Sequence, residues 1–204
     1  MDLLPDTNQK FGKKEYWDQR YREEAEGTFD WFKAYDEISS VIHELIPSRD
    51  AEILMLGCGN STLSEDMYDD SYHRITNIDY SGVVIEQMTA RHSEKRPVMT
   101  WIEMDVRHLD FRDASFDVAI DKGTLDAMLT PKDVWNPDPQ MVSDCNAEID
   151  EAYRILRPGG RLIYLTFGQP HFRKQYLNRH DWKLEIRELG ESFHYYLYVC
   201  TKQE

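Results

Sequence analysis

The sequence predicts an α/β fold: a Rossmann-like, seven-stranded, mainly parallel sheet with helices on both faces and a C-terminal antiparallel hairpin. Three observations predict it. Short apolar runs alternate with helical patterns five times between residues 53 and 167. The first apolar run ends in a glycine-rich turn, GCGNS, at residues 57–61. The second run ends at Asp79, about 20 residues after that turn, where an acid can hold a ribose.

The elements follow from hydrophobic periodicity and from their end signals. Apolar or alternating runs predict strands at 53–56, 74–78, 99–103, 116–120, 161–167, 183–189 and 193–200. Helical spacing predicts helices at 14–24, 35–45, 61–68, 83–92, 145–156 and 171–178. The last two strands are joined by Gly190-Glu191-Ser192, which predicts a hairpin turn.

These elements predict one domain over residues 1–204, with a helical lid segment at 1–46 and a Rossmann-like core at 47–204. Residues 1–12 are polar and carry no functional inference. The segment 130–144 is rich in proline and is predicted to be a long loop. It leaves the carboxyl edge of the sheet, which is where open α/β sheets bind ligands.

The glycine-rich turn predicts a nucleoside site. Gly57 and Gly59 allow a tight turn and a close approach of backbone to ligand, and Asp79 can accept hydrogen bonds from both ribose hydroxyls. A dinucleotide fingerprint would need a third glycine at position 62, where Thr62 stands. The plain alternative is an ordinary strand-to-helix turn.

This turn and the acid beyond it resemble motif I of the class I S-adenosylmethionine-dependent methyltransferases. The resemblance implies S-adenosylmethionine as cofactor and S-adenosylhomocysteine as product, with Tyr80 beside Asp79 in the site. Asp105, after the third strand, corresponds to the family's adenine-binding acid, and Met104 and Val106 would cover the ring. The alternative for Asp105 is a helix cap or a surface acid.

The segment DKGTLD at residues 121–126 leaves the fourth strand, where this family places the groups nearest the transferred methyl. Asp121 and Asp126 are the candidate catalytic carboxylates, because a carboxylate can orient an ammonium or the water that takes its proton. Asp121 and Lys122 are also expected at the cofactor, although Lys122 could simply pack its stem across the pocket. The alternative for each charge is a solvated loop.

The strings YWDQRY (16–21), FDWF (29–32) and DKGTLDA (121–127) resemble the eukaryotic lysine methyltransferases that act on translation elongation factor 1 alpha, and their near relatives. In that family the aromatic N-terminal helix folds over the cofactor. The resemblance therefore implies that Trp17 and Tyr21 line the methionine side, with Trp31 or Phe32 nearby. The alternative is that these aromatic residues belong to the core.

The net charge of −14 opposes direct nucleic-acid binding, which needs a basic face. It suits a basic protein partner, or serves solubility alone. The sequence contains no membrane-spanning run and no zinc or disulfide pattern; the three cysteines indicate reduced thiols in an intracellular protein.

The sequence therefore predicts a cytoplasmic, monomeric, metal-free methyltransferase, and the resemblance implies that it is a protein-lysine N-methyltransferase acting on elongation factor 1 alpha. Two alternatives stay open: a methyltransferase for small amines or carboxylates, and a cofactor-binding module without turnover.

Overall fold

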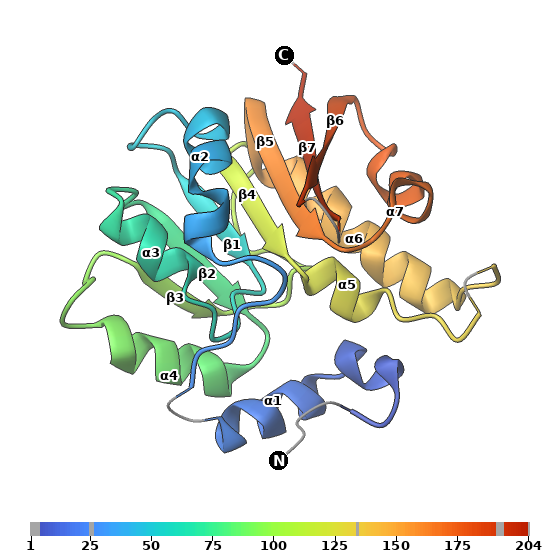
Figure 1. Ribbon diagram of the computed structural model, residues 1–204, viewed down its shortest axis with the longest axis horizontal. Coiled ribbons are helices and arrows are strands. Elements are labelled where there is room, and N and C mark those ends of the chain that lie inside the picture. The colour runs from blue at the N-terminus through green and yellow to red at the C-terminus, as the bar shows by residue number, and fades with distance from the viewer. Residues whose placement is uncertain (1–4, 25–26, 134, 191–193, 204) are drawn as a thin grey trace.

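A computed structural model describes residues 5–24, 27–133, 135–190 and 194–203. It contains one seven-stranded sheet with the order β3-β2-β1-β4-β5-β7-β6 (Figure 1). The strands are β1 (Ile53–Leu56), β2 (Ile75–Asp79), β3 (Thr100–Glu103), β4 (Phe116–Lys122), β5 (Leu156–Thr166), β6 (Trp182–Leu189) and β7 (Tyr195–Lys202). The strands up to β5 pair in parallel, and β7 pairs antiparallel with both β5 and β6. The predicted fold class is confirmed.

The chain order reverses between β1 and β4, so their carboxyl ends form the switch point where such sheets bind ligands. The helices are η1 (Asn8–Gly12), α1 (Lys14–Glu23), α2 (Tyr35–Leu45), α3 (Leu63–Asp69), α4 (Gly82–His92), α5 (Thr124–Met128), α6 (Pro139–Ile155) and α7 (Pro170–Leu177). In Figure 1, α1 crosses below the carboxyl edge of the sheet. It packs against α4, while η1 packs against α5.

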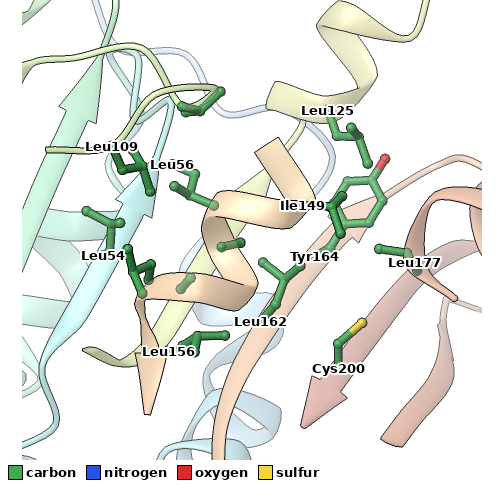
Figure 2. Close-up of a cluster of buried hydrophobic side chains, with 14 of the residues drawn as sticks. Leu54, Leu56, Leu109, Leu125, Ile149, Leu156, Leu162, Tyr164, Leu177 and Cys200 are labelled. Atoms are coloured by element: carbon green, nitrogen blue, oxygen red, sulfur yellow. The ribbon is translucent and has the colours of Figure 1, made fainter. Parts of the chain in front are cut away.

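Side chains alternate between the two faces of the sheet and build a core on each. On one face, Leu54, Leu162 and Tyr164 pack against α6, as Figure 2 shows. On the other face, Ile53 and Met55 pack against α2 and α3. Both faces of the sheet are therefore covered. The carboxyl edge is left as the place where a ligand could bind.

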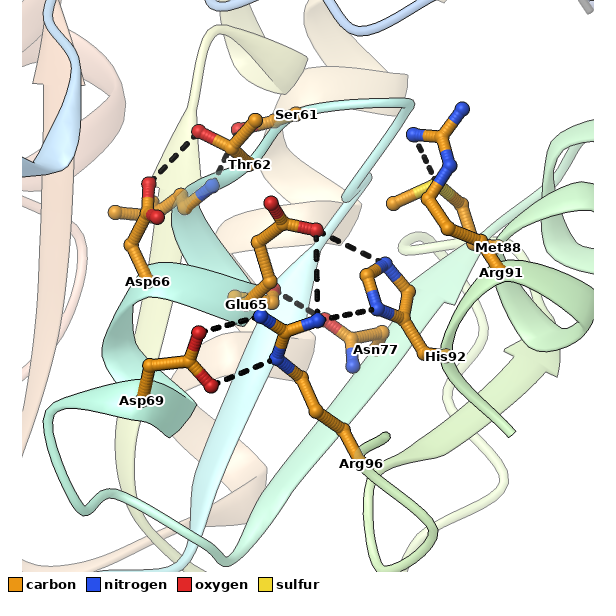
Figure 3. A network of polar contacts seen from close by, with 12 residues as sticks. Ser61, Thr62, Glu65, Asp66, Asp69, Asn77, Met88, Arg91, His92 and Arg96 are labelled. Atoms are coloured by element: carbon orange, nitrogen blue, oxygen red, sulfur yellow. Dashed lines mark hydrogen bonds and ion pairs between the residues drawn. The ribbon is translucent and has the colours of Figure 1, made fainter. Parts of the chain in front are cut away.

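Helix α3, which follows the glycine-rich turn, makes a network of polar contacts with its neighbours (Figure 3). Arg96 forms a bidentate pair with Asp69 and lies 3.8 Å from Glu65. Ser64 donates a hydrogen bond of 2.5 Å to Asn77 of β2. These contacts hold the turn at a fixed place above the sheet.

Several predicted boundaries are wrong around β4. Helix α5, which the sequence did not predict, begins at Thr124, just after that strand. The predicted loop 130–144 is shorter, because α6 begins at Pro139 and not at residue 145. Asp138 caps α6 by accepting from the Gln140 and Met141 amides, and proline is well suited to the first helical position.

Other differences are smaller. Strand β4 extends two residues further, to Lys122, and β5 begins at Leu156, so that residues 157–160 belong to the strand with a register irregularity. Residues 8–12 of the polar N-terminal stretch form η1. Of the predicted hairpin turn 190–192, only Gly190 lies within the described residues.

In the described part of the chain, no helix is long and apolar enough to cross a bilayer. The three cysteines are free, and Cys145 and Cys200 are buried.

Candidate active site at the carboxyl edge of the sheet

A cavity of about 900 Å³ lies between the carboxyl ends of the central strands and the N-terminal helices. The glycine-rich turn, the loop after β3, α5 and the 130–141 segment contribute to its walls. Its volume falls in the range of small-molecule and cofactor sites, which is about 300–1,000 Å³. The walls come from parts of the chain that are distant in sequence and that meet at the switch point.

The glycines of the turn are required by its conformation and by its neighbours. Gly57 has a φ of 63° and Gly59 a φ of 52°, in the left-handed region that favours glycine. A Cβ on Gly57 would lie 2.1 Å from the Thr124 hydroxyl, and one on Gly59 would lie 2.9 Å from the Tyr21 hydroxyl. The backbone is thus approached closely by α5 and α1, in addition to any approach by a ligand.

Asp79 ends β2 and lines the cavity, although only 5% of it is exposed. Its Oδ2 accepts from the Gly59 amide at 3.0 Å and its Oδ1 from the Ser81 amide at 2.9 Å. These bonds fix the carboxylate and leave each oxygen with further acceptor capacity. Burial raises the pKa of Asp79 to about 6 despite the two amides. Hydrogen bonds donated by the hydroxyl groups of a ligand would favour the ionised form of Asp79.

The predicted adenine side has a different character. Asp105 and Val106 line the cavity, as does Tyr80, whereas Met104 packs into the core on the α6 side. Asp105 is already engaged by Arg107, whose Nη2 lies 2.6 Å from Asp105 Oδ2. This arginine also pairs with Asp144 of α6 at 3.0 Å, so the wall is braced by α6.

The N-terminal aromatic residues close the opposite wall. Trp17 and Tyr21 line the cavity, are 8% and 5% exposed, and stack with ring centroids 5.8 Å apart. The Trp17 indole donates to the Phe11 carbonyl at 2.6 Å, and Gln87 of α4 donates to the Tyr21 carbonyl at 2.9 Å. These residues are therefore both packed and at the cavity surface.

Lys122 ends β4 and lines the cavity. Its Nζ donates to Asp30 at 2.7 Å and to the carbonyl of Trp31, another lining residue, at 3.1 Å. Asp30 also accepts from the Ser61 hydroxyl and, at 3.2 Å, from the Thr62 amide. Burial lowers the pKa of Lys122, but the paired Asp30 opposes this shift. Through these contacts, Asp30 joins the aromatic segment at residues 29–32 to the glycine-rich turn.

Asp121 and Asp126 do not lie among the residues that line the cavity. Asp121 is 2% exposed and accepts from the amides of Thr124 at 2.7 Å and Leu125 at 3.0 Å, which caps α5. Asp126 accepts from Tyr164 and Thr166 of β5 and pairs with Arg173 at 2.6 Å. Their contacts are with the protein, and a catalytic part for them stays a prediction.

A third carboxylate, Glu148 of α6, is buried beside them. Its two oxygens make no hydrogen bond that meets ordinary geometry, and it is 1% exposed. Burial and then Asp121 raise its pKa well above the usual range for a glutamate. Burial and then Asp126 raise the pKa of Asp121 to about 7. The acids at the end of β4 thus form a cluster inside the protein.

Three residues that shape the site escaped the sequence prediction. Asp30 anchors the aromatic segment, Thr124 donates to the Leu56 carbonyl at 2.8 Å, and Asn60 donates to Glu24 at 3.1 Å. Thr124 and Asn60 stand inside the DKGTLD and GCGNS motifs, yet small polar residues there look like ordinary turn and cap residues. Only their long-range partners reveal the role.

Comparisons with known proteins agree with this geometry. A methyltransferase domain model matches residues 54–164. EEF1A lysine methyltransferase 4 of Mus musculus is 39% identical over 98% of this chain and 79% of that protein. The eEF1A lysine and N-terminal methyltransferase of Homo sapiens is 36% identical over 94% of this chain, which spans only 27% of that longer protein.

Two solved structures show the same fold. The N-methyltransferase NodS from Bradyrhizobium japonicum WM9, in complex with S-adenosylhomocysteine, matches with a TM-score of 0.65 and 16% identity, over 92% of this chain and 99% of that one. The [4+2]-cyclase SpnF matches with a TM-score of 0.68 and 14% identity, over 98% and 97%. The cyclase is a reminder that fold alone does not fix the reaction. Here the domain match and the relatives identify the class of reaction. The chain belongs to the S-adenosylmethionine-dependent methyltransferases, in the same family as EEF1A lysine methyltransferase 4.

Proposed function

We propose that this methyltransferase transfers a methyl group to a lysine of translation elongation factor 1 alpha, in the cytoplasm. The observation that carries the proposal is the match to relatives that are named for this activity and that align with 94–98% of the chain. The acidic net charge of −14 supports a basic protein as acceptor. We expect the protein to act as a monomer, without contact to membrane or nucleic acid.

The residues around the cavity fit S-adenosylmethionine. Asp79 would hold the ribose hydroxyls, because its carboxylate is fixed at the cavity wall and retains acceptor capacity. Asp105 and Val106 would meet the adenine, with Tyr80 beside them. Met104 packs against the core on the α6 side, and its contact with the adenine ring stays a prediction.

The remaining walls suit the methionine part. Trp17, Tyr21 and Trp31 offer aromatic surface, which attracts cationic groups. The cofactor supplies an electrophilic methyl group on a positively charged sulfur when it is bound. Gly57 and Gly59 would bring backbone close to it. Lys122 would act by holding the Asp30–Trp31 segment in place.

The chain's contribution to transfer is mainly positioning and exclusion of water, since an amine needs only a free lone pair in line with the methyl group. The lysine must first lose a proton. Asp121 and Asp126 remain candidates for an indirect part: their contacts support α5 and the end of β5, which border the acceptor side.

The direct test is incubation of the protein with labelled S-adenosylmethionine and cell extract, followed by identification of the labelled protein and residue. We expect label on a lysine of elongation factor 1 alpha. The matched control is Asp79→Ala, which should lose most of the label. Label on small amines or carboxylates alone would favour the small-molecule alternative. Binding of S-adenosylhomocysteine with no labelled acceptor would favour a module without turnover.

A further inference from the structure

The segment from Phe29 to Phe32 is held in an unusual conformation beside the cavity. Phe32 has a φ of 67°, in the left-handed region that non-glycine residues rarely occupy. Strain of this kind persists only where the surroundings fix it, and it gathers at functional sites. Here the Asp30 contacts with Lys122, Ser61 and Thr62 fix it. The backbone of this segment is therefore fixed, and its aromatic rings are held in one arrangement.

Those rings continue outward from the cavity. Phe29 and Trp31 line the cavity, and their ring centroids lie 4.9 Å apart. Phe32 lies 6.4 Å from Trp31 and 5.6 Å from Phe167, which follows β5. Tyr195 of β7 lies 5.8 Å from Phe32. We call these five residues the aromatic row: Phe29, Trp31, Phe32, Phe167 and Tyr195.

The row joins the cavity to the outer surface. Its inner end is close to the end of β4, because a Cβ on Gly123 would lie only 3.2 Å from the Phe32 ring. Gly123 lines the cavity. Phe29, at the cavity, is 41% exposed, and Phe167, at the other end of the row, is 51% exposed. Aromatic rings in mutual contact thus extend from the exposed Phe167, through Phe32, to the carboxyl end of β4.

Ring faces of the row already receive cations from this chain. The Arg20 guanidinium lies 5.0 Å from the Phe29 centroid and 5.5 Å from that of Trp31. Lys33 Nζ lies 5.4 Å from the Tyr195 centroid. Both cations are neutralised, Arg20 by Glu24 at 3.0 Å and Lys33 by Glu37 at 2.6 Å.

The neighbouring Lys122 is likewise paired with Asp30. The cations near the row are therefore balanced by partner acids, in a protein with a net charge of −14. A positively charged acceptor meets no uncompensated like charge from these three residues. Aromatic faces attract ammonium groups and pack well against alkyl chains.

We propose that the aromatic row is the acceptor-docking surface, along which a lysine of a basic protein segment enters with its alkyl stem and ammonium group on the ring faces. This inference rests on the proposed function and names the surface that serves it. Phe167 is the residue to test, because it is exposed, belongs to the row and does not line the cofactor cavity.

The experiment compares methylation kinetics of Phe167→Ala and Phe167→Leu with the wild type, on purified elongation factor 1 alpha. Truncating an aromatic residue that an interface buries as a hot spot changes affinity by ~10-fold or more, so KM for the protein should rise by about that factor in Phe167→Ala if the acceptor covers this ring. We expect kcat and the affinity for S-adenosylhomocysteine to change little. Phe167→Leu keeps apolar bulk without the ring, and should fall on the side of Phe167→Ala. Val98→Ala, at another exposed apolar residue, is the matched control and should keep the wild-type KM.

The outcomes separate the two proposals. A wild-type protein that labels no lysine overturns the proposed function and this inference with it. A wild type that labels lysine, with an unchanged KM in folded Phe167→Ala, overturns the docking surface alone. A wild-type KM in Phe167→Leu would show that the ring face is not what the acceptor uses, and would also contradict the proposal. Thermal unfolding of each variant establishes that it is folded.

Discussion

Two acids at the ends of the parallel strands that flank β1 look alike in the sequence and differ in the structure. Asp79 ends β2 and lines the cavity, held by two backbone amides. Asp121 stands near the end of β4 and caps α5 from inside the protein. Both are almost fully buried from solvent, yet only Asp79 is placed to meet a ligand.

The difference follows from strand register. Leu56 of β1 is level with Ile78 of β2 and with Asp121 of β4. One residue further along, Asp79 is level with Lys122, which does line the cavity. Because successive side chains point to opposite faces of a sheet, a difference of one residue sends Asp121 toward α5 and α6. An acid that follows an apolar run can therefore be assigned to the carboxyl edge of the sheet from the sequence. The face of the sheet toward which its side chain points cannot be assigned in this way.

The largest expected effect is a loss of stability when a Cβ is added at Gly57, in the turn beside the cavity. Gly57→Ala places a Cβ against Thr124 and also strains a positive φ. We expect it to lower the free energy of unfolding by roughly 2–6 kcal/mol, the sum of overpacking and backbone strain. Urea unfolding measures this. Gly159→Ala is the matched control, because its φ is 77° and a Cβ there meets nothing within 4 Å. Equal losses in the two variants would mean that the contact with Thr124 is unimportant.

The buried acids on the β4 side should reveal themselves through pH. Folding raises the pKa of Asp121 to about 7 and that of Glu148 well above its usual range. Above about pH 5 the unfolded chain has lost these protons while the native state keeps them, so the free energy of unfolding falls as pH rises. Glu148→Gln removes one such group. We expect a shallower fall, by up to ~1.4 kcal/mol per pH unit.

Urea unfolding between pH 6.5 and 8 is the suitable range. His92 has a pKa lowered to about 4 by burial, which makes stability rise with pH up to the ordinary value of 6.5. Above that pH its effect is constant. Parallel curves for the wild type and Glu148→Gln would show that Glu148 is already ionised in the native state.

A smaller effect should appear in the aromatic wall of the cavity. Trp17 and Tyr21 pack against α4, yet they also line the cavity. If residues 1–46 act as a lid, S-adenosylhomocysteine should slow proteolysis of this segment several-fold, because a ligand orders a lid. Sites in the β6–β7 hairpin serve as the control and should be cut at an unchanged rate. Equal cleavage of the segment with and without ligand would identify these residues as core alone.

Much of the fold could be predicted because its signals are local. The buried runs of β1 and β2, the glycine-rich turn and the helical spacing of 35–45 each declare their element, and the last of these agrees with α2 residue for residue. The wrong boundaries lie where helices begin with a polar residue or a proline, at Thr124 and Pro139, because these residues also mark loops.

The site was less predictable, since its decisive contacts join distant segments. Asp79 could be proposed from spacing, but the pairing of Lys122 with Asp30 spans 92 residues and has no local signature. Likewise, nothing near Asp126 in sequence indicates its pair with Arg173, 47 residues away. Charged residues in a motif are natural candidates for chemistry, and only the packing shows which of them are occupied by the protein itself.

The most direct test of the contrast between the two acids is calorimetric titration of S-adenosylhomocysteine into Asp79→Asn and Asp121→Asn at pH 7.5. Asp79, with a pKa of about 6, is ionised there. Loss of its charged hydrogen bonds should cost about 1.5–3 kcal/mol, or roughly 10- to 150-fold in affinity. Asp121→Asn, which touches no cavity surface, should bind with nearly wild-type affinity. Equal losses in the two variants, or a loss confined to Asp121→Asn, would contradict this account of the site.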